Sequence, residues 1–168
     1  MKRFAVLCLT LVMAFGLVAC GGNNNNGNGG GGDTPTDPVV LDMPAVYEKL
    51  GQAAEMPEMY KVEDDMLLDL YGIRAEDVKQ ILVYDCVDYL RADEIWLVEA
   101  VNADAAAVIK GLAETRVQDL DTQSVTYSPE QNAVVKKAQI LQQGNYIALI
   151  VSPDVEALAQ AFRAEAGL

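Results

Sequence analysis

A run of glycine and asparagine between residues 21 and 38 limits how much of this chain can fold. Its sequence, GGNNNNGNGGGGDTPTDP, offers no apolar face. Such a segment cannot bury enough surface to offset the entropy lost on ordering, so we expect a flexible stalk that reaches roughly 25 Å. The folded part must lie after it. Residues 43–168 have about the commonest size of a single domain, and we expect one acidic domain there.

The residues before the stalk resemble the signal peptide of a bacterial lipoprotein. Lys2 and Arg3 form a short basic start, and residues 4–17 are almost entirely apolar. This apolar span is shorter than the ~20 residues that a membrane-crossing helix needs, and it has the length of a signal-peptide core. It ends in four residues that resemble a lipobox, the motif read by lipoprotein signal peptidase: Leu17, Val18, Ala19 and Cys20.

The lipobox resemblance implies that residues 1–19 are removed and that Cys20 then carries a diacylglycerol group on its sulfur. Two acyl chains, at ~0.8 kcal/mol per buried methylene, make such an anchor effectively permanent. We therefore expect residues 20–42 to be the lipidated cysteine and its stalk. The domain would stand on the extracytoplasmic face of the cell membrane, and a stalk of this kind is similar to those of Gram-positive surface lipoproteins.

The composition excludes several classes of function. The chain has 25 acidic and 12 basic residues, for a formal net charge of −13. This charge repels nucleic-acid phosphates, so we expect no nucleic-acid partner. The sequence contains no histidine, which excludes Ser-His-Asp and Cys-His catalysis and removes the commonest metal ligand. We expect neither a metal nor a cofactor.

The pattern of apolar residues after the stalk predicts an α+β domain. Two short helices are expected first, at residues 43–54 and 64–71. Two groups of strands follow, each succeeded by a helix. The first group has strands at 79–88 and 94–101 and a helix ending near residue 115; the second has strands at 139–143 and 146–151 and a helix from residue 154. Less regular chain and a short helix at 129–137 connect the groups.

A weak internal repeat relates the two groups. With an offset of 50, residues 96–112 align without a gap on residues 146–162, and apolar positions such as Leu112 and Phe162 coincide. The shared pattern predicts two ββα units. Their hairpins are expected to form one antiparallel four-stranded sheet with helices packed on it, preceded by the short N-terminal helices.

Several short motifs between residues 45 and 162 identify a family. They are Leu70-Tyr71-Gly72-Ile73, the strand that begins Glu94-Ile95-Trp96, then Arg116, Gln118, Tyr127 and Pro129, and finally the stretch 144–152. In their order and spacing the domain resembles the bacterial lipoproteins called domain of unknown function 4358. The usual aromatic residue a few positions before Tyr127 is replaced near Ser124 and Val125. The family has no established activity, so the resemblance implies only the fold and the cellular address.

Trp96 and Tyr146 occupy matching positions in the two ββα units and form a possible binding surface. If the helices cover one face of the sheet, the other face can expose this aromatic pair. Tryptophan and tyrosine anchor protein, peptide or glycan partners well. Packing of the pair beneath the N-terminal helices is an equal alternative.

Cys86 is the single cysteine of the expected domain, because Cys8 and Cys20 belong to the export and lipidation segments. A reactive thiolate needs a cationic neighbour or a helix N-terminus. Its neighbours Asp85 and Asp88 instead disfavour the thiolate. We therefore expect a buried structural residue and no disulfide within the domain.

Two acidic groups have simple explanations. The spacing of acids in residues 119–130 matches part of a calcium loop, but Ser124 stands where that loop needs glycine, so we attribute the match to chance. The acids between residues 63 and 69 favour the dipole of the helix they begin. A patch for a basic partner is the alternative for the second group.

These observations favour a surface-displayed, non-enzymatic binding module of the cell envelope. The partner would be an envelope protein, a peptide or a glycan. The alternative is an envelope hydrolase for glycans or peptides that uses two carboxylates, as glycosidases do. No pair of acids stands out in the sequence to support it.

The lipobox predicts that Cys20 is lipidated in cells. Metabolic labelling with a clickable fatty acid should mark the wild-type chain and not Cys20→Ala. Cys8→Ala is the matched control and should be labelled like the wild type. Equal labelling of the Cys20→Ala chain would contradict the prediction.

Overall fold

The computed structural model describes residues 40–168. The expected signal peptide, the lipobox with Cys20 and nearly all of the expected stalk therefore lie outside the described residues. Within residues 40–168, no helix combines the length and apolar character needed to cross a bilayer.

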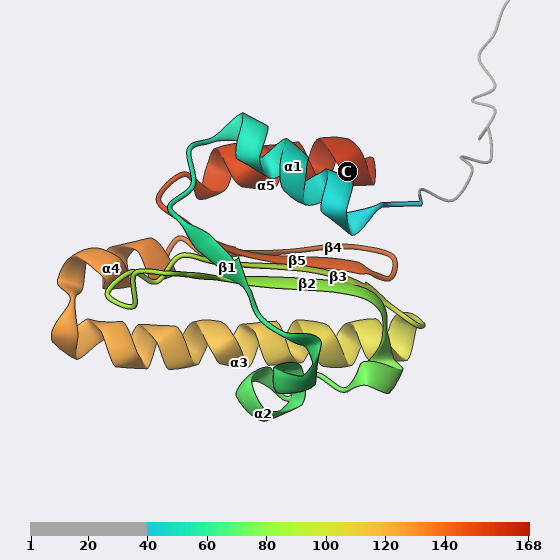
Figure 1. The fold of residues 1–168 in the computed structure, drawn as a ribbon, viewed down its shortest axis with the longest axis horizontal. Coiled ribbons are helices and arrows are strands. Elements are labelled where there is room, and N and C mark those ends of the chain that lie inside the picture. Colours follow the sequence, from blue (N-terminus) through green and yellow to red (C-terminus); the bar gives the residue numbers. More distant parts are fainter. Residues whose placement is uncertain (1–39) are drawn as a thin grey trace, which may run out of the picture. The chain divides into compact units, whose positions relative to one another are not determined.

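The described residues form one antiparallel sheet with helices on both of its faces (Figure 1). The strands, in the order β1-β2-β3-β5-β4, are β1 (Met59–Lys61), β2 (Val78–Cys86), β3 (Glu94–Ala100), β5 (Tyr146–Val151) and β4 (Gln139–Gln143). One face carries α1 (Met43–Ala53) and α5 (Val155–Ala166). The other carries α3 (Ala103–Tyr127), with the short helices α2 (Leu67–Tyr71) and α4 (Pro129–Val135) beside it. The expected mixture of helices and one antiparallel sheet is confirmed.

Each face of the sheet packs its own hydrophobic core. On the α3 face, Trp96 and Leu149 pack with Ile109 of the helix. On the other face, Leu97 of β3 packs with Phe162 of α5. Because both faces are covered, the interior strand β5 is buried at all six positions, which explains why its sequence, YIALIV, is apolar without alternation.

The sheet has five strands rather than the expected four. The additional strand, β1, has only three residues and pairs with the edge of β2, where Tyr60 lies opposite Asp85. A three-residue strand is too short to show the alternation of apolar and polar residues by which strands are recognised in a sequence.

Of the two alternatives for Trp96 and Tyr146, the exposed aromatic pair is wrong, because both side chains are buried. Trp96 lies directly opposite Leu149 across β3 and β5, so these two side chains point to the same face. Tyr146 precedes Leu149 by three positions and therefore points to the opposite face. Trp96 is buried in the core beneath α3, and Tyr146 is buried in the core beneath α1 and α5. The offset of 50 thus aligns residues whose side chains point to opposite faces of the sheet. In agreement, α3, which follows β3, and α5, which follows β5, cover opposite faces (Figure 1).

Helix α3 is much longer than expected. It begins at a cap in which the Asn102 side chain accepts a hydrogen bond from the amide of Ala105, and it runs for 25 residues. It ends at Tyr127, and the side chain of the next residue, Ser128, caps α4 by accepting a hydrogen bond from the amide of Gln131. Most of residues 119–130 are therefore helical and do not form a calcium loop. In the described part of the chain, no group of three or more acidic or cysteine side chains is placed to hold a metal ion.

Gly72 fixes the end of α2. Its φ of 73° is left-handed, and a Cβ there would lie 3.3 Å from Leu112 of α3. Glycine is the residue that adopts this conformation without strain. It lets the chain turn from α2 towards β2 while the two helices stay close.

The packing of α5 on the sheet predicts that two substitutions of apolar residues by alanine differ strongly in their effect on the free energy of unfolding. Phe162→Ala removes a fully buried ring and should lower the free energy of unfolding by about 3–5 kcal/mol. Leu68→Ala is the control, because Leu68 is exposed on α2, and should change it by less than about 0.5 kcal/mol. Urea unfolding followed by circular dichroism measures both; equal losses would show that α5 does not pack as described.

Candidate functional site

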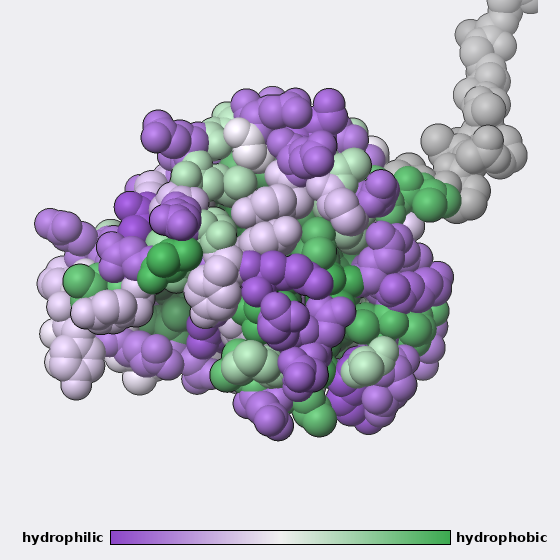
Figure 2. Space-filling view, viewed as in Figure 1, coloured by the Kyte–Doolittle hydropathy of each residue, from purple (hydrophilic) through white to green (hydrophobic). Residues whose placement is uncertain are grey.

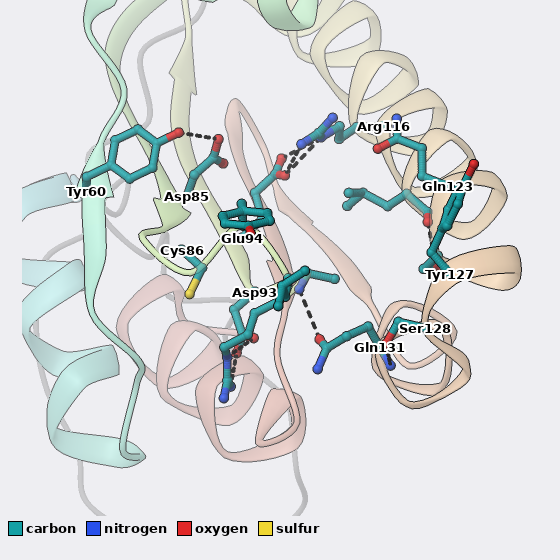
Figure 3. Close-up of a pocket in the computed structure, with 16 residues that line it drawn as sticks. Tyr60, Asp85, Cys86, Asp93, Glu94, Arg116, Gln123, Tyr127, Ser128 and Gln131 are labelled. Carbon is teal, nitrogen blue, oxygen red and sulfur yellow. Dashed lines mark hydrogen bonds and ion pairs between the residues drawn. The ribbon is translucent and has the colours of Figure 1, made fainter.

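A cavity of about 560 Å³ opens at one end of the sheet (Figure 3). Its walls come from β1, from the ends of β2 and β3 with the loop between them, from the second half of α3 and from the start of α4. Pockets that enclose small ligands have volumes of roughly 300–1,000 Å³. Elsewhere on the face drawn in Figure 2, hydrophobic residues form small patches among hydrophilic ones.

A buried ion pair between Glu94 and Arg116 crosses from the sheet to α3 in this cavity. Nε of Arg116 donates to the two carboxylate oxygens at 3.0 and 2.9 Å, and Nη2 donates to Oε2 at 2.6 Å. Nε1 of Trp96 donates to Oε1 at 2.6 Å. Burial raises the pKa of Glu94, and the hydrogen bonds from Arg116 oppose that rise. Both oxygens of Glu94 are thus occupied.

Asp85 lies opposite Glu94 in the pairing of β2 with β3. Its Oδ2 accepts hydrogen bonds from the hydroxyls of Tyr71, at 2.7 Å, and Tyr60, at 3.2 Å. Its Oδ1 is buried and has no hydrogen-bond partner among the described residues. Leaving a buried acceptor unsatisfied costs about 1–3 kcal/mol, and more for a charged group. Asp85, Glu94 and Arg116 together form what we call the polar floor.

Tyr71 ties the polar floor to α2. Its ring meets the indole of Trp96 edge-on, with centroids 5.2 Å apart, and the guanidinium carbon of Arg116 lies 5.2 Å from the same ring centroid. Burial, and then the hydrogen bond to Asp85, raise the pKa of Tyr71. The Tyr71 hydroxyl therefore stays protonated and remains a donor to Asp85.

The cavity is lined by three acidic and two basic residues, so one acidic residue has no basic partner among them. Arg91 and Asp93 form a two-pronged ion pair at 2.9 and 3.1 Å, and Arg116 pairs with Glu94. Asp85 is the remaining charged residue that lines the cavity, and it forms no ion pair within residues 40–168. The cavity therefore carries one excess negative charge.

Three of the residues that line the cavity are strongly exposed. Tyr89 and Tyr127 are 89% and 88% exposed, and Leu90 is 66% exposed. We call these three residues the apolar rim. The loop that carries Tyr89 and Leu90 is held to α4, because the amide of Ala92 donates to Oε1 of Gln131 at 3.0 Å.

The residues singled out in the sequence do not assemble into one site. Trp96 supports the polar floor from below as a buried donor to Glu94. Tyr146 lies in the opposite core, where its hydroxyl accepts a hydrogen bond from the amide of Leu41. Cys86 is buried as expected and ends β2 at the cavity wall. The acidic group at residues 63–69 lies outside the cavity lining.

Sequence reasoning missed the residues that the cavity brings together. In the sequence, Asp85 stands out only as an acidic neighbour of Cys86. The motifs that carry the family resemblance contain four residues of the site: Tyr71, Glu94, Arg116 and Tyr127. Their occurrence in these motifs is the sequence signal that could have indicated the site.

The fold and the cavity define a small domain with helices on both sides of an antiparallel sheet and a recessed acidic site at one sheet end. Residues 52–152 match the family described as Domain of unknown function (DUF4358). This match covers more than half of the chain and includes every residue that lines the cavity. The chain belongs to this family, as the motifs predicted. Searches of curated proteins and of solved structures give no match.

The ion pair predicts strong coupling between Glu94 and Arg116. Arg116→Met leaves a buried carboxylate uncompensated and should lower the free energy of unfolding by about 3–5 kcal/mol. Adding Glu94→Gln, which removes the charge and keeps an acceptor for Trp96, should restore most of that loss. A double-mutant cycle from chemical denaturation gives the coupling energy. Additive losses from the two substitutions would contradict the buried pair.

Proposed function

We propose that this chain is a lipid-anchored surface protein of the bacterial cell envelope whose domain binds a ligand in the cavity without catalysing a reaction. The anchor is proposed from the lipobox and Cys20, with the domain on the extracytoplasmic side. The proposed partner is an envelope protein, a peptide or a glycan, and not a nucleic acid.

The arrangement of the cavity carries the proposal for binding. The polar floor, with its unsatisfied acceptor, and the exposed side chains of the apolar rim line the same cavity. Exposed large apolar groups around a hollow are typical of interaction sites, and tyrosine contributes strongly to contact energy there. The polar floor can orient a ligand while the apolar rim covers it.

The hydrolase alternative gains one observation from the structure. Asp85 and Glu94 are paired carboxylates within one cavity. Glycosidases need two carboxyl groups that are free to act on either side of the bond that breaks. Here Arg116 and Trp96 occupy both oxygens of Glu94, so this residue is not free to transfer a proton or attack. The binding function is therefore favoured.

Photo-crosslinking in intact cells tests the proposed site. A photoreactive residue in place of Tyr89 or Tyr127 should give a crosslinked product. The same residue in place of Val108, which is exposed on α3 and does not line the cavity, should give none. Equal products from all three positions would place binding outside the cavity and refute the proposal.

A further inference from the structure

The geometry points to an alkylammonium group as the chemical feature that the cavity recognises, bound by the carboxylate of Asp85. This inference rests on the proposed binding function and names the class of ligand for the same site. It follows from three observations on charge, hydrogen bonding and access.

The first observation is the excess negative charge. Arg91 and Arg116 are each committed to an acid, at 2.9 and 2.6 Å, and Asp85 has only hydroxyl partners. The whole chain also carries a formal net charge of −13. A cleft with this sign concentrates cations and repels anions. Phosphate and carboxylate ligands are therefore disfavoured, and a neutral sugar leaves the charge of Asp85 uncompensated.

The second observation is which hydrogen bonds remain to be made. Oδ1 of Asp85 lacks a donor, whereas Oδ2 already accepts a short hydrogen bond of 2.7 Å from the buried Tyr71. A guanidinium binds a carboxylate best through two parallel hydrogen bonds to its two oxygens. An ammonium group is a compact charge with three donors and needs only one open acceptor position on the carboxylate. With one oxygen sealed from water and the other held by Tyr71, the carboxylate therefore fits an ammonium better than a guanidinium.

The third observation is that the half-exposed Tyr60 forms the longer hydrogen bond and is the more accessible of the two hydroxyl donors to Asp85. Figure 3 shows its hydroxyl reaching from β1 to the Asp85 carboxylate, at 3.2 Å. Tyr60 is 49% exposed, and β1 is a three-residue strand at the edge of the sheet. Because Oδ1 is sealed from water in this structure, a ligand first reaches the carboxylate at Oδ2, where it replaces the longer hydrogen bond from Tyr60. Tyr71 keeps its own.

The apolar rim accounts for the alkyl part of the ligand. Leu90 and the exposed rings of Tyr89 and Tyr127 line the same cavity as Asp85. Tyrosine faces also attract cations. The volume suits a small free amine or a single lysine side chain of a peptide, and both sources share the same ammonium chemistry.

Calorimetric titration of the full-length chain in nonionic detergent at pH 7 tests the inference. The probes are n-butylamine, a Gly-Lys-Gly peptide with blocked ends, n-butylguanidine and n-butanol. We expect saturable binding of the amine or the peptide, at least tenfold weaker binding of the guanidine and no binding of the alcohol. Tighter binding of the peptide identifies a lysine side chain as the source, and tighter binding of n-butylamine identifies a free amine.

Two variants and a control make the test specific. Asp85→Asn keeps an acceptor for Tyr71 and should weaken amine binding at least tenfold. Asp119→Asn removes the same charge from an exposed site outside the cavity and should bind like the wild type. Tyr60→Phe removes the competing hydroxyl and should tighten amine binding several-fold, which keeps the test decisive even if Asp85→Asn fails to fold.

Three results would overturn the inference: binding of n-butanol as tight as that of the amine, unchanged amine binding in a folded Asp85→Asn chain, or no gain in Tyr60→Phe. The crosslinking experiment at positions 89 and 127 distinguishes a failure of the ammonium inference from a failure of the proposed binding function. Crosslinks confined to the cavity, without amine binding, would leave a binding module with another ligand class.

Discussion

The ion pair between Glu94 and Arg116 is the contact on which the cavity depends. It joins the first residue of β3 to the middle of α3, and the ring of Tyr71 from α2 packs against the same guanidinium. Buried ion pairs contribute little net stability compared with an apolar replacement, but breaking one is costly. The pair therefore fixes where α3 and α2 lie on the sheet. It also occupies Arg116, the one arginine of α3, so that α3 provides no arginine to pair with the neighbouring Asp85.

The double covering of the sheet explains both the success and the failure of the repeat. Strands β4 and β5 were predicted with the bounds that the structure shows, because Gly144-Asn145 marks a hairpin between two groups of strand formers. The alignment of Trp96 with Tyr146 matched two buried aromatic residues correctly by type. It could not reveal that the two lie on opposite faces, since the pairing register between β3 and β5 is a property of the folded sheet.

The cavity was harder to predict than the fold for the same physical reason. Asp85 and Glu94 become neighbours only through the register of β2 with β3, and Arg116 reaches them from a helix whose second half shows no clear apolar periodicity. The motif residues did point to the correct segments. What the sequence lacks is any local sign of which acid remains without a basic partner.

The place where the chain enters the domain has a mechanical consequence. The amide of Leu41 donates a hydrogen bond to the hydroxyl of Tyr146, and Tyr146 pairs with Glu99. Glu99 lies near one end of β3, whereas Glu94 and the cavity lie at the other end. These two ends are separated by the length of a seven-residue strand, about 20 Å. Tension between the proposed membrane tether and a captured ligand would thus run along the strands. The rows of hydrogen bonds between them would be loaded in shear and share the force, rather than opening one after another.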